Sequence, residues 1–143
     1  MPTRPDPGSD LAGYLAGAWR VERDVRDGER HGRFEGVATF TQEPGGELRW
    51  DETGELRLGP YRGPARRQLR LVPDGDAWEV RFEDGRPFHR LDLRAGRWTA
   101  GHDCRADRYD GVFSIAGDDA FEVAWDVAGP AKDQRILSRY ERR

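Results

Sequence analysis

The stretch LAGYLAGAWRVERDV (Leu11–Val25) decides the fold, because its pattern changes once from a helix to a strand. Asp10 stands directly before it and is a residue suited to cap a short helical turn over residues 11–17. From Trp19 onward apolar and polar residues alternate, so that Trp19 and Val21 share one face. This period of two predicts a β-strand that begins immediately after the helical turn.

The same alternation continues through the rest of the chain between regularly spaced turns. Turn signals such as Asp27-Gly28, Asp84-Gly85 and Gly129-Pro130 recur at the short spacing that is typical of all-β proteins. A long antiparallel meander avoids exposed edges most easily by closing on itself. We therefore expect an all-β fold, an antiparallel up-and-down barrel of about ten strands with a short N-terminal helical turn. The expected strands lie near residues 18–26, 32–41, 47–58, 65–72, 77–83 and 87–94, with two within 97–115 and two around 121–127 and 136–140.

Length and charge narrow the class of protein. A chain of 143 residues is large enough for one domain with its own core. Residues 1–9 are rich in proline and predict a disordered tail, followed by a single barrel domain over residues 10–143. The net charge of −3 offers no basic surface for nucleic acid, and no apolar run is long enough to cross a membrane. With no signal peptide and one cysteine, we expect a cytoplasmic protein that is a monomer or homodimer.

Two resemblances support the barrel. Gly17-Ala18-Trp19 resembles the G-x-W signature of the calycin barrels, the superfamily of lipocalins and fatty-acid-binding proteins. This resemblance implies that Trp19 plugs one end of the barrel and that Arg139 or Arg142 packs over it. The chain also resembles a small bacterial domain family of unknown function, which implies no known activity. The motifs of that second resemblance are FEDGRPFHRLDL (82–93), GHDCRADRYDG (101–111) and WDVAGPAKDQRILSRY (125–140).

Polar side chains share the expected inward face with large apolar ones. An unpaired buried charge is costly, so these groups must pair with one another, meet water in the lumen, or meet a ligand. A barrel of about ten strands is wide enough to hold a small molecule. Structural ion pairs, either Arg23 with Glu52 or Arg67 with Asp107, are the alternative. The inward polar set comprises Arg23, Glu52, Arg67, His89, His102, Cys104, Asp107 and Tyr109.

We expect the lumen to bind a small organic molecule that is anionic or polar-aromatic. An arginine at Arg23, Arg67 or Arg86 would hold its polar group through a fork of N–H donors. Arg86 directly follows a tight turn, so an ion pair with Asp84 is the alternative for it. The other expected ligand-binding residues are Trp50, Glu52, Trp98, Asp107 and Trp125.

A second hypothesis is a cofactor-independent enzyme of isomerase, cyclase or lyase type in the same cavity. His89 or His102 would act as acid or base, an arginine would anchor an anion, and Tyr109 would donate a hydrogen bond. Cys104 would be a nucleophile if His89 lay within hydrogen-bond reach and Asp107 oriented that histidine. Otherwise Cys104 is a small inert apolar residue.

Metal and haem binding are a further alternative. His89, His102 and Cys104, with Asp103 or Asp107, are residue types that bind zinc, and either histidine could ligate haem. However, their spacing matches no closed zinc motif, and the sequence has no phosphate-binding loop or serine nucleophile motif. We therefore expect no metal and no cofactor. A purely structural or interaction domain remains the third functional class.

Overall fold

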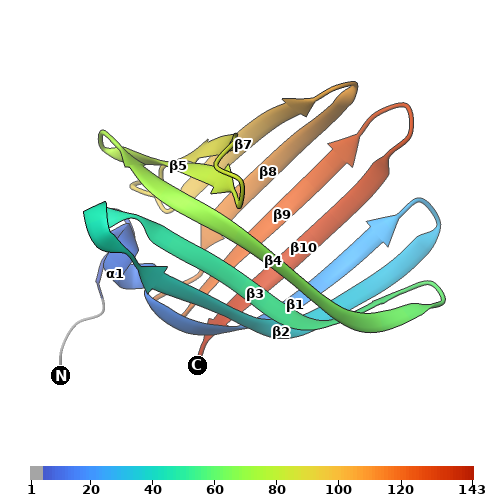
Figure 1. The fold of residues 1–143 in the computed structure, drawn as a ribbon, viewed down its shortest axis with the longest axis horizontal. Helices are drawn as coiled ribbons and strands as arrows, with labels where there is room; N and C mark the ends of the chain where they lie inside the picture. Colours follow the sequence, from blue (N-terminus) through green and yellow to red (C-terminus); the bar gives the residue numbers. More distant parts are fainter. Residues whose placement is uncertain (1–4) are drawn as a thin grey trace.

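One antiparallel sheet makes up the computed structural model, which describes residues 5–143. Its strand order is β6-β5-β4-β3-β2-β1-β10-β9-β8-β7, so every neighbouring pair except β1 and β10 is consecutive in the chain. The sheet coils round into a nearly closed barrel (Figure 1), which confirms the expected all-β meander of ten strands with a short helical turn. The elements are α1 (Leu11–Leu15), β1 (Gly17–Asp27), β2 (Arg30–Gln42), the 3-10 turn η1 (Pro44–Gly46), β3 (Leu48–Leu58), β4 (Tyr61–Asp74), β5 (Ala77–Phe82), β6 (Pro87–Leu91), β7 (Arg97–Cys104), β8 (Asp107–Ile115), β9 (Ala120–Ala128) and β10 (Asp133–Arg142).

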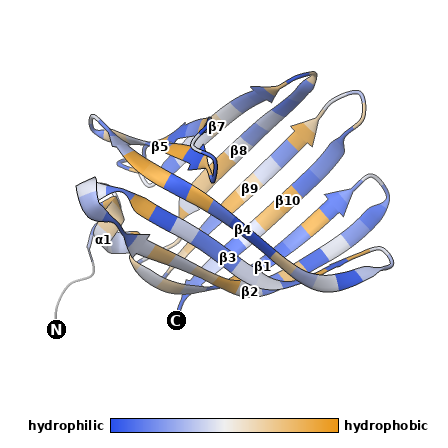
Figure 2. Cartoon of the chain, in the orientation of Figure 1, coloured by the Kyte–Doolittle hydropathy of each residue, from blue (hydrophilic) through white to orange (hydrophobic). Residues whose placement is uncertain are grey.

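Strict alternation along the strands separates the core from the outer face. Orange and blue segments alternate along the strands in Figure 2. In β9, Phe121, Val123 and Trp125 are buried, while Glu122 between them is half-buried and pairs with Arg139 on the neighbouring strand. The apolar core therefore fills the inside of the barrel, and salt bridges cover much of the outside.

The two ends of the barrel differ. At one end, which we call the mouth, the five hairpins β1–β2, β3–β4, β5–β6, β7–β8 and β9–β10 turn. Gly28 (φ 61°) and Gly85 (φ 89°) take left-handed backbone conformations in two of these turns, which explains the glycines there. At the other end, α1 closes the barrel, and the Asp10 carboxylate accepts a hydrogen bond from the Gly13 N–H at 2.9 Å, as expected for the cap.

Trp19 plugs the closed end. It is fully buried, and its indole Nε1 donates to the Leu15 carbonyl at 2.8 Å. The Arg142 guanidinium lies 4.2 Å above the Trp19 ring and donates to the Tyr14 carbonyl at 2.9 Å. Of the two expected basic residues, Arg142 therefore covers the tryptophan, whereas Arg139 lies half-exposed on the outer face.

The barrel stays open along one seam. In the described part of the chain, β6 and β7 are the two ends of the sheet and share no backbone ladder. The Trp98 indole crosses this seam and donates to the Arg90 main-chain carbonyl at 2.7 Å. Nearer the mouth, the Phe88 ring of β6 meets the His102 ring of β7, with centroids 5.2 Å apart. Side chains therefore close the barrel where the backbone does not.

The structure describes the expected N-terminal tail, residues 1–9, only in part. Residues 1–4 lie outside the described residues. Further along, the Asp10 N–H donates to the Asp6 carbonyl at 2.7 Å and forms a turn directly before α1. No helix within residues 5–143 is both long and apolar enough to cross a membrane.

Candidate functional site

A buried ionic cluster lies inside the barrel, centred on the Glu52 carboxylate of β3. Its Oε1 accepts from Arg23 Nη2 at 2.7 Å and lies 3.1 Å from Arg67 Nε. Its Oε2 accepts from Trp50 Nε1 at 2.9 Å and from the Tyr140 hydroxyl. Four donor residues from strands β1, β3, β4 and β10 thus converge on a carboxylate that is only 1% exposed.

This cluster carries one uncompensated positive charge. Burial opposes ionisation of Glu52, but Arg67, Arg23 and the Tyr140 hydrogen bond outweigh it and lower the pKa of Glu52 to about 2. Burial raises the pKa of Tyr140, so its hydroxyl stays neutral. Two guanidinium groups, of which that of Arg67 is 40% exposed, therefore face a single carboxylate, and the cluster keeps a net charge of about +1.

Each guanidinium is held in place by neighbouring groups but keeps unused hydrogen-bond donors. Arg23 Nε donates to Ser138 Oγ at 2.7 Å, and its guanidinium lies 5.0 Å from the Phe34 ring centroid. The Arg67 guanidinium lies 5.3 Å from the Trp50 ring. Among residues 5–143, the Nη1 atoms of Arg23 and Arg67 have no hydrogen-bond partner. In the same range, every fully buried side-chain nitrogen of a residue that is not exposed has a hydrogen-bond partner. Both Nη1 groups therefore keep unused hydrogen-bond donors.

A hollow of about 230 Å³ lies next to this cluster. Along β3, Leu56 and Leu58 follow Glu52 toward the hairpin tip, and along β1, Val25 follows Arg23. Arg23 and Glu52 therefore form the floor of the hollow and apolar side chains form the walls nearer the mouth, whereas Arg66 and Arg67 are exposed. The lining comprises Arg23, Val25, Phe34, Glu52, Leu56, Leu58, Ala65, Arg66 and Arg67.

Glycines on two strands make room for the hollow. Gly36 and Gly54 lie opposite each other across β2 and β3 and face the lumen without side chains. The Phe34 ring covers both, since a Cβ added at either glycine would come within 2.8 Å of it. Paired glycines of this kind allow the sheet to bend sharply. The two glycines therefore make room for the Phe34 ring, which lines the hollow.

An aromatic cluster fills the other side of the lumen. Phe88 stacks on Trp125 with centroids 5.1 Å apart, and the His89 ring lies 5.3 Å from both Phe113 and Trp125. The alternation along the strand predicted that His89 points inward, but it did not predict this for Phe88, its neighbour in β6. Both enter the barrel because the register between β5 and β6 shifts after Val80, which no period-two pattern reveals. The cluster comprises Phe82, Phe88, His89, His102, Tyr109, Phe113 and Trp125.

His89 is a neutral hydrogen-bond acceptor. Its Nδ1 lies 2.8 Å from the Arg90 main-chain carbonyl, which can only accept, so Nδ1 carries the ring proton. Burial lowers the pKa of His89 to about 4; the carbonyl bond opposes this, and the charges of His102 and Arg67 add to it. At neutral pH the imidazole is therefore uncharged, with the lone pair on Nε2.

Tyr109 and Asp107 meet a lysine at the rim. The Tyr109 hydroxyl accepts from Lys132 Nζ at 3.1 Å, and Nζ lies 3.7 Å from the Asp107 carboxylate. The predicted pair of Arg67 with Asp107 is therefore wrong, and Arg67 binds Glu52 instead. The hairpin register pairs Leu58 with Tyr61, and this places Glu52 directly opposite Arg67 on the neighbouring strand.

Of the expected site residues only Arg23, Glu52 and Arg67 line the hollow, and Cys104, Arg86 and Trp98 belong to neither the ionic nor the aromatic cluster. The expectation that Cys104 faces inward is wrong: it is exposed at the tip of β7, where the chain leaves the barrel wall and Arg105 turns at φ 59°. Arg86 is exposed and pairs with Asp84 at 2.7 Å, which is the alternative interpretation for that residue. Trp98 ties the seam together and lies outside the lining of the hollow.

The zinc interpretation has no geometric support. Within residues 5–143, no three histidine, cysteine, aspartate or glutamate side chains lie close enough together to hold a metal ion. His89, His102 and Cys104 therefore do not form the ligand set that their residue types suggested.

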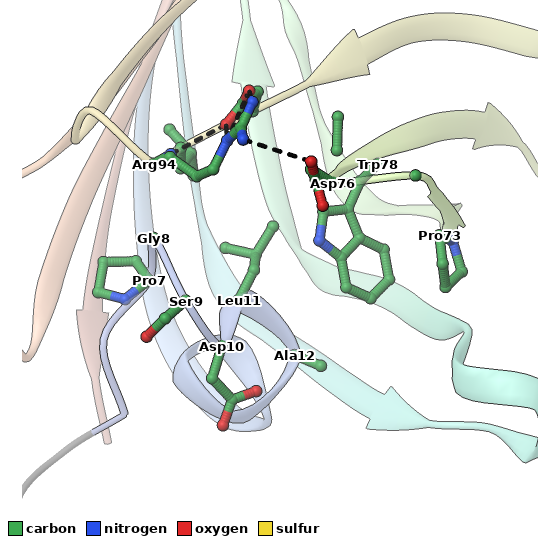
Figure 3. Close-up of a pocket in the computed structure, with 14 residues that line it drawn as sticks. Pro7, Gly8, Ser9, Asp10, Leu11, Ala12, Pro73, Asp76, Trp78 and Arg94 are labelled. Carbon is green, nitrogen blue, oxygen red and sulfur yellow. Dashed lines mark hydrogen bonds and ion pairs between the residues drawn. The ribbon is translucent and has the colours of Figure 1, made fainter.

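A second and larger hollow, of about 560 Å³, lies at the closed end. Figure 3 shows Leu11 and Ala12 of α1 on one side of it and Trp78 on the other. Its cation, Arg94, is already matched by Asp92 at 2.6 Å and Asp76 at 3.7 Å. Its lining holds three aspartates, Asp10, Asp76 and Asp92, against the single cation Arg94, and none of the expected site residues. The hollow at the mouth, which contains expected site residues and excess positive charge, is therefore the better candidate despite its smaller volume.

Solved structures with the same fold include proteins of several kinds. The S-type phycobiliprotein lyase CPES from Guillardia theta is 11% identical, with a TM-score of 0.71, and the match covers 94% of this chain and 91% of that one. A DUF3598-family protein of unknown function from Nostoc punctiforme is 11% identical, with a TM-score of 0.65, over 92% of this chain and 49% of that one. EF1p2_mFAP2b, solved bound to DFHBI, is 12% identical, with a TM-score of 0.50, over 95% and 99% of the two chains.

At these identities the likeness concerns the fold alone, and it agrees with the antiparallel barrel that the sequence predicts. No curated protein sequence matches significantly. The model of a family of unknown function, DUF6314, matches residues 15–142. That match spans almost the whole barrel, from the end of α1 to the last residue of β10. The chain therefore belongs to the DUF6314 family.

Proposed function

We propose that this barrel binds a small organic monoanion, with the anionic group at the ionic floor and an apolar body along the walls of the hollow. The observation that carries this proposal is the inverted polarity of the hollow. Arg23, whose side chain is 12% exposed, and Arg67, whose side chain is 40% exposed, face the one buried carboxylate of Glu52 with one positive charge in excess, while Leu56 and Leu58 line the way out. An amphipathic anion satisfies both parts of this surface at once.

Both interactions contribute favourably to the binding free energy of such an anion. A carboxylate on the guanidinium donors forms charge-assisted hydrogen bonds and neutralises the excess charge. An apolar body removes wall surface from water, which contributes about 25 cal/mol for each Å² buried. The hollow of about 230 Å³ is smaller than the 300–1,000 Å³ that drug-sized ligands usually occupy, so the ligand is compact or leaves its far end outside the mouth.

Two relatives in fold support a role in handling small molecules. One barrel of this fold is a phycobiliprotein lyase, and another was solved bound to DFHBI. The fold can therefore present its interior to an organic molecule. The choice of an anion for this chain comes from its own arginines, not from those relatives.

Calorimetry with matched ligands tests the proposal. Benzoate and hexanoate should bind more tightly than benzamide and hexanamide, because only the acids meet the excess positive charge. Arg67→Gln should weaken binding of both acids about tenfold, which corresponds to about 1.4 kcal/mol, and leave the amides unchanged. Arg70→Gln is the control, since Arg70 lies on the outer face of the same strand, half-exposed and 4.0 Å from Glu47.

Two results would contradict the proposal. Acids and amides of equal affinity would show that the arginines do not select an anion. An equal loss in Arg67→Gln and Arg70→Gln would show that the effect is one of net charge and not of the site.

A further inference from the structure

Ala65 has the smallest side chain in the lining of the hollow, and it lies beside the ionic cluster. It shares the inward face of β4 with Arg67, two residues along the strand, so the two Cα atoms lie about 7 Å apart by strand rise. Ala65 pairs with Gly54 of β3, two residues along from the pair of Glu52 and Arg67. On this side of the hollow, the wall next to the anion-binding group is therefore a single methyl group.

The positions beside Ala65 across the sheet add no side chains of their own. Gly54 pairs with Ala65, Gly36 pairs with Gly54, and the Phe34 ring covers both glycines. Ala65 contacts the edge of the apolar core but is only half-buried, and it lines the same hollow as Arg67. Alanine is depleted in strands, so strand propensity does not account for its presence here. The space beside its methyl group is therefore within reach of a ligand that Arg67 holds.

The larger apolar side chains of the lining lie farther from the ionic cluster. Along β3, Leu56 and Leu58 follow Gly54 toward the hairpin tip, and along β1, Val25 lies nearer the tip than Arg23. The wall thus changes from small to bulky side chains on the way to the mouth. A linear chain would leave the apolar surface near the anion-binding group unburied, whereas a ligand that is broad next to its anionic group would bury it.

Resting on the proposed function, we infer that Ala65 determines the shape of the ligand, and that the hollow selects carboxylates that are branched or carry a ring at the carbon next to the carboxylate. The carboxylate lies at the donors of Arg23 and Arg67, and the branch or ring fills the space beside Ala65. The rest of the apolar body passes Leu56 toward the mouth. A bulkier side chain in place of Ala65 occupies that space itself, so it excludes the branch and still admits a linear chain.

The test uses two isomeric acids, 2,2-dimethylbutanoate and hexanoate, which have the same charge and the same number of carbon atoms. Calorimetry with the full chain should show the branched acid binding about tenfold more tightly, because only the branch fills the space beside Ala65. Ala65→Leu should weaken binding of the branched acid about tenfold and leave hexanoate affinity nearly unchanged. Ala124→Leu is the matched control, since Ala124 is half-buried on the outer face of β9, between the buried Val123 and Trp125.

Two further measurements accompany the affinities. Ala65→Leu and the smaller change Ala65→Val should melt at or above the temperature of the parent, because both side chains enter existing space. Ala65→Val should reduce the preference for the branched acid part of the way, which keeps the test decisive if the leucine variant does not fold. In spectra of the alanine methyl groups, the Ala65 signal should shift when 2,2-dimethylbutanoate is added, and the Ala124 signal should not.

The outcomes separate this inference from the proposed function. If both acids bind through Arg67 with equal affinity, or if the preference survives in Ala65→Leu and Ala65→Val, the inference is overturned and the anion site stands. A large drop in the melting temperature of Ala65→Val would show that Ala65 packs in the core and borders no space, which also overturns it. If neither acid binds, the proposed function fails, and the inference fails with it.

Discussion

At the scale of single residues, Glu52 shows why a buried charge is tolerated in this barrel. The carboxylate receives hydrogen bonds from arginine, tryptophan and tyrosine side chains, so almost none of its bonding capacity is left unsatisfied. Removing one partner of such a pair usually costs about 3–5 kcal/mol, because the other charge stays buried alone. The ionic cluster therefore makes the fold depend on protonation state, and His89 adds to that dependence.

The first prediction is that the protein loses stability in mild acid through His89. Its pKa is about 4 when folded and 6.5 ordinarily, so between these values only the unfolded chain takes up the proton. The stabilisation is therefore complete above pH 6.5 and is lost as the pH falls toward 4, with roughly 2 kcal/mol gone by pH 5. Glu52, with a pKa of about 2 against 4.5, extends the loss below pH 4.5.

Urea unfolding at pH 7 and pH 5 measures this slope. His89→Phe should flatten the change in the free energy of unfolding between the two pH values, whereas His31→Gln, an exposed position in the β1–β2 hairpin, should leave it as in the parent. A slope that His89→Phe does not alter would show that another group carries the acid sensitivity.

At the scale of elements, the seam between β6 and β7 is the weakest part of the barrel wall. These two strands have one ladder each, whereas β1 is paired on both sides. Trp98 crosses the seam with one hydrogen bond, and Phe88 and His102 meet across it. Strands held in this way are expected to open locally more often than the rest of the sheet.

Trp98→Phe tests the role of the seam. It removes the indole donor and keeps an aromatic ring, so we expect a loss of about 1 kcal/mol in the free energy of unfolding. Amide hydrogen exchange should accelerate selectively in β6 and β7, with β1 unchanged. Trp78→Phe is the matched control, because the Trp78 indole is half-buried and makes no hydrogen bond within residues 5–143; an equal acceleration there would contradict this role.

At the scale of the whole molecule, the barrel divides its two ends between stability and binding. At the closed end the Trp19 ring packs against Tyr14 and Phe121, with centroids 5.6 Å and 4.9 Å away. The mouth holds the ionic cluster and the hollow beside it. Changes at the closed end should therefore affect stability without affecting ligand binding.

Arg142→Met tests this division. The substitution removes the charge above Trp19 and the hydrogen bond to the Tyr14 carbonyl, so we expect a loss of about 1.5–3 kcal/mol and a lower melting temperature. Benzoate affinity should stay as in the parent when measured well below the transition. Arg139→Met, on the outer face of the same strand, should change stability by less than about 0.5 kcal/mol; a loss equal to that of Arg142→Met would refute the plug.

Catalytic roles for His89, His102 and Tyr109 stay predictions. The Tyr109 hydroxyl contacts Lys132, and Cys104 is exposed at the tip of β7, so the proposed thiolate nucleophile has no base within the barrel. The Nδ1 proton of His89 is held by the main chain, which suits an acceptor better than an acid.

The sequence by itself determined the strands, the turns, the helical cap and the inward face. These features depend on local chemistry: the period of two places Trp19, Trp50 and Trp125 inside, and Gly28 and Gly85 supply the turn conformations. The plug of Trp19 with a basic residue of the last strand was implied by the resemblance to the G-x-W signature, and the structure shows Arg142 in that place.

Only the tertiary structure decided which inward groups meet. Arg67 pairs with Glu52 and not with Asp107, since strand register and the curvature of the sheet set the partners across the lumen. Phe88 enters the barrel through a register shift, and Cys104 leaves it because its strand passes beyond the rim. The alternation of side chains along a strand shows on which side of the sheet a residue lies. The distance between two residues on that side depends on how the whole sheet closes.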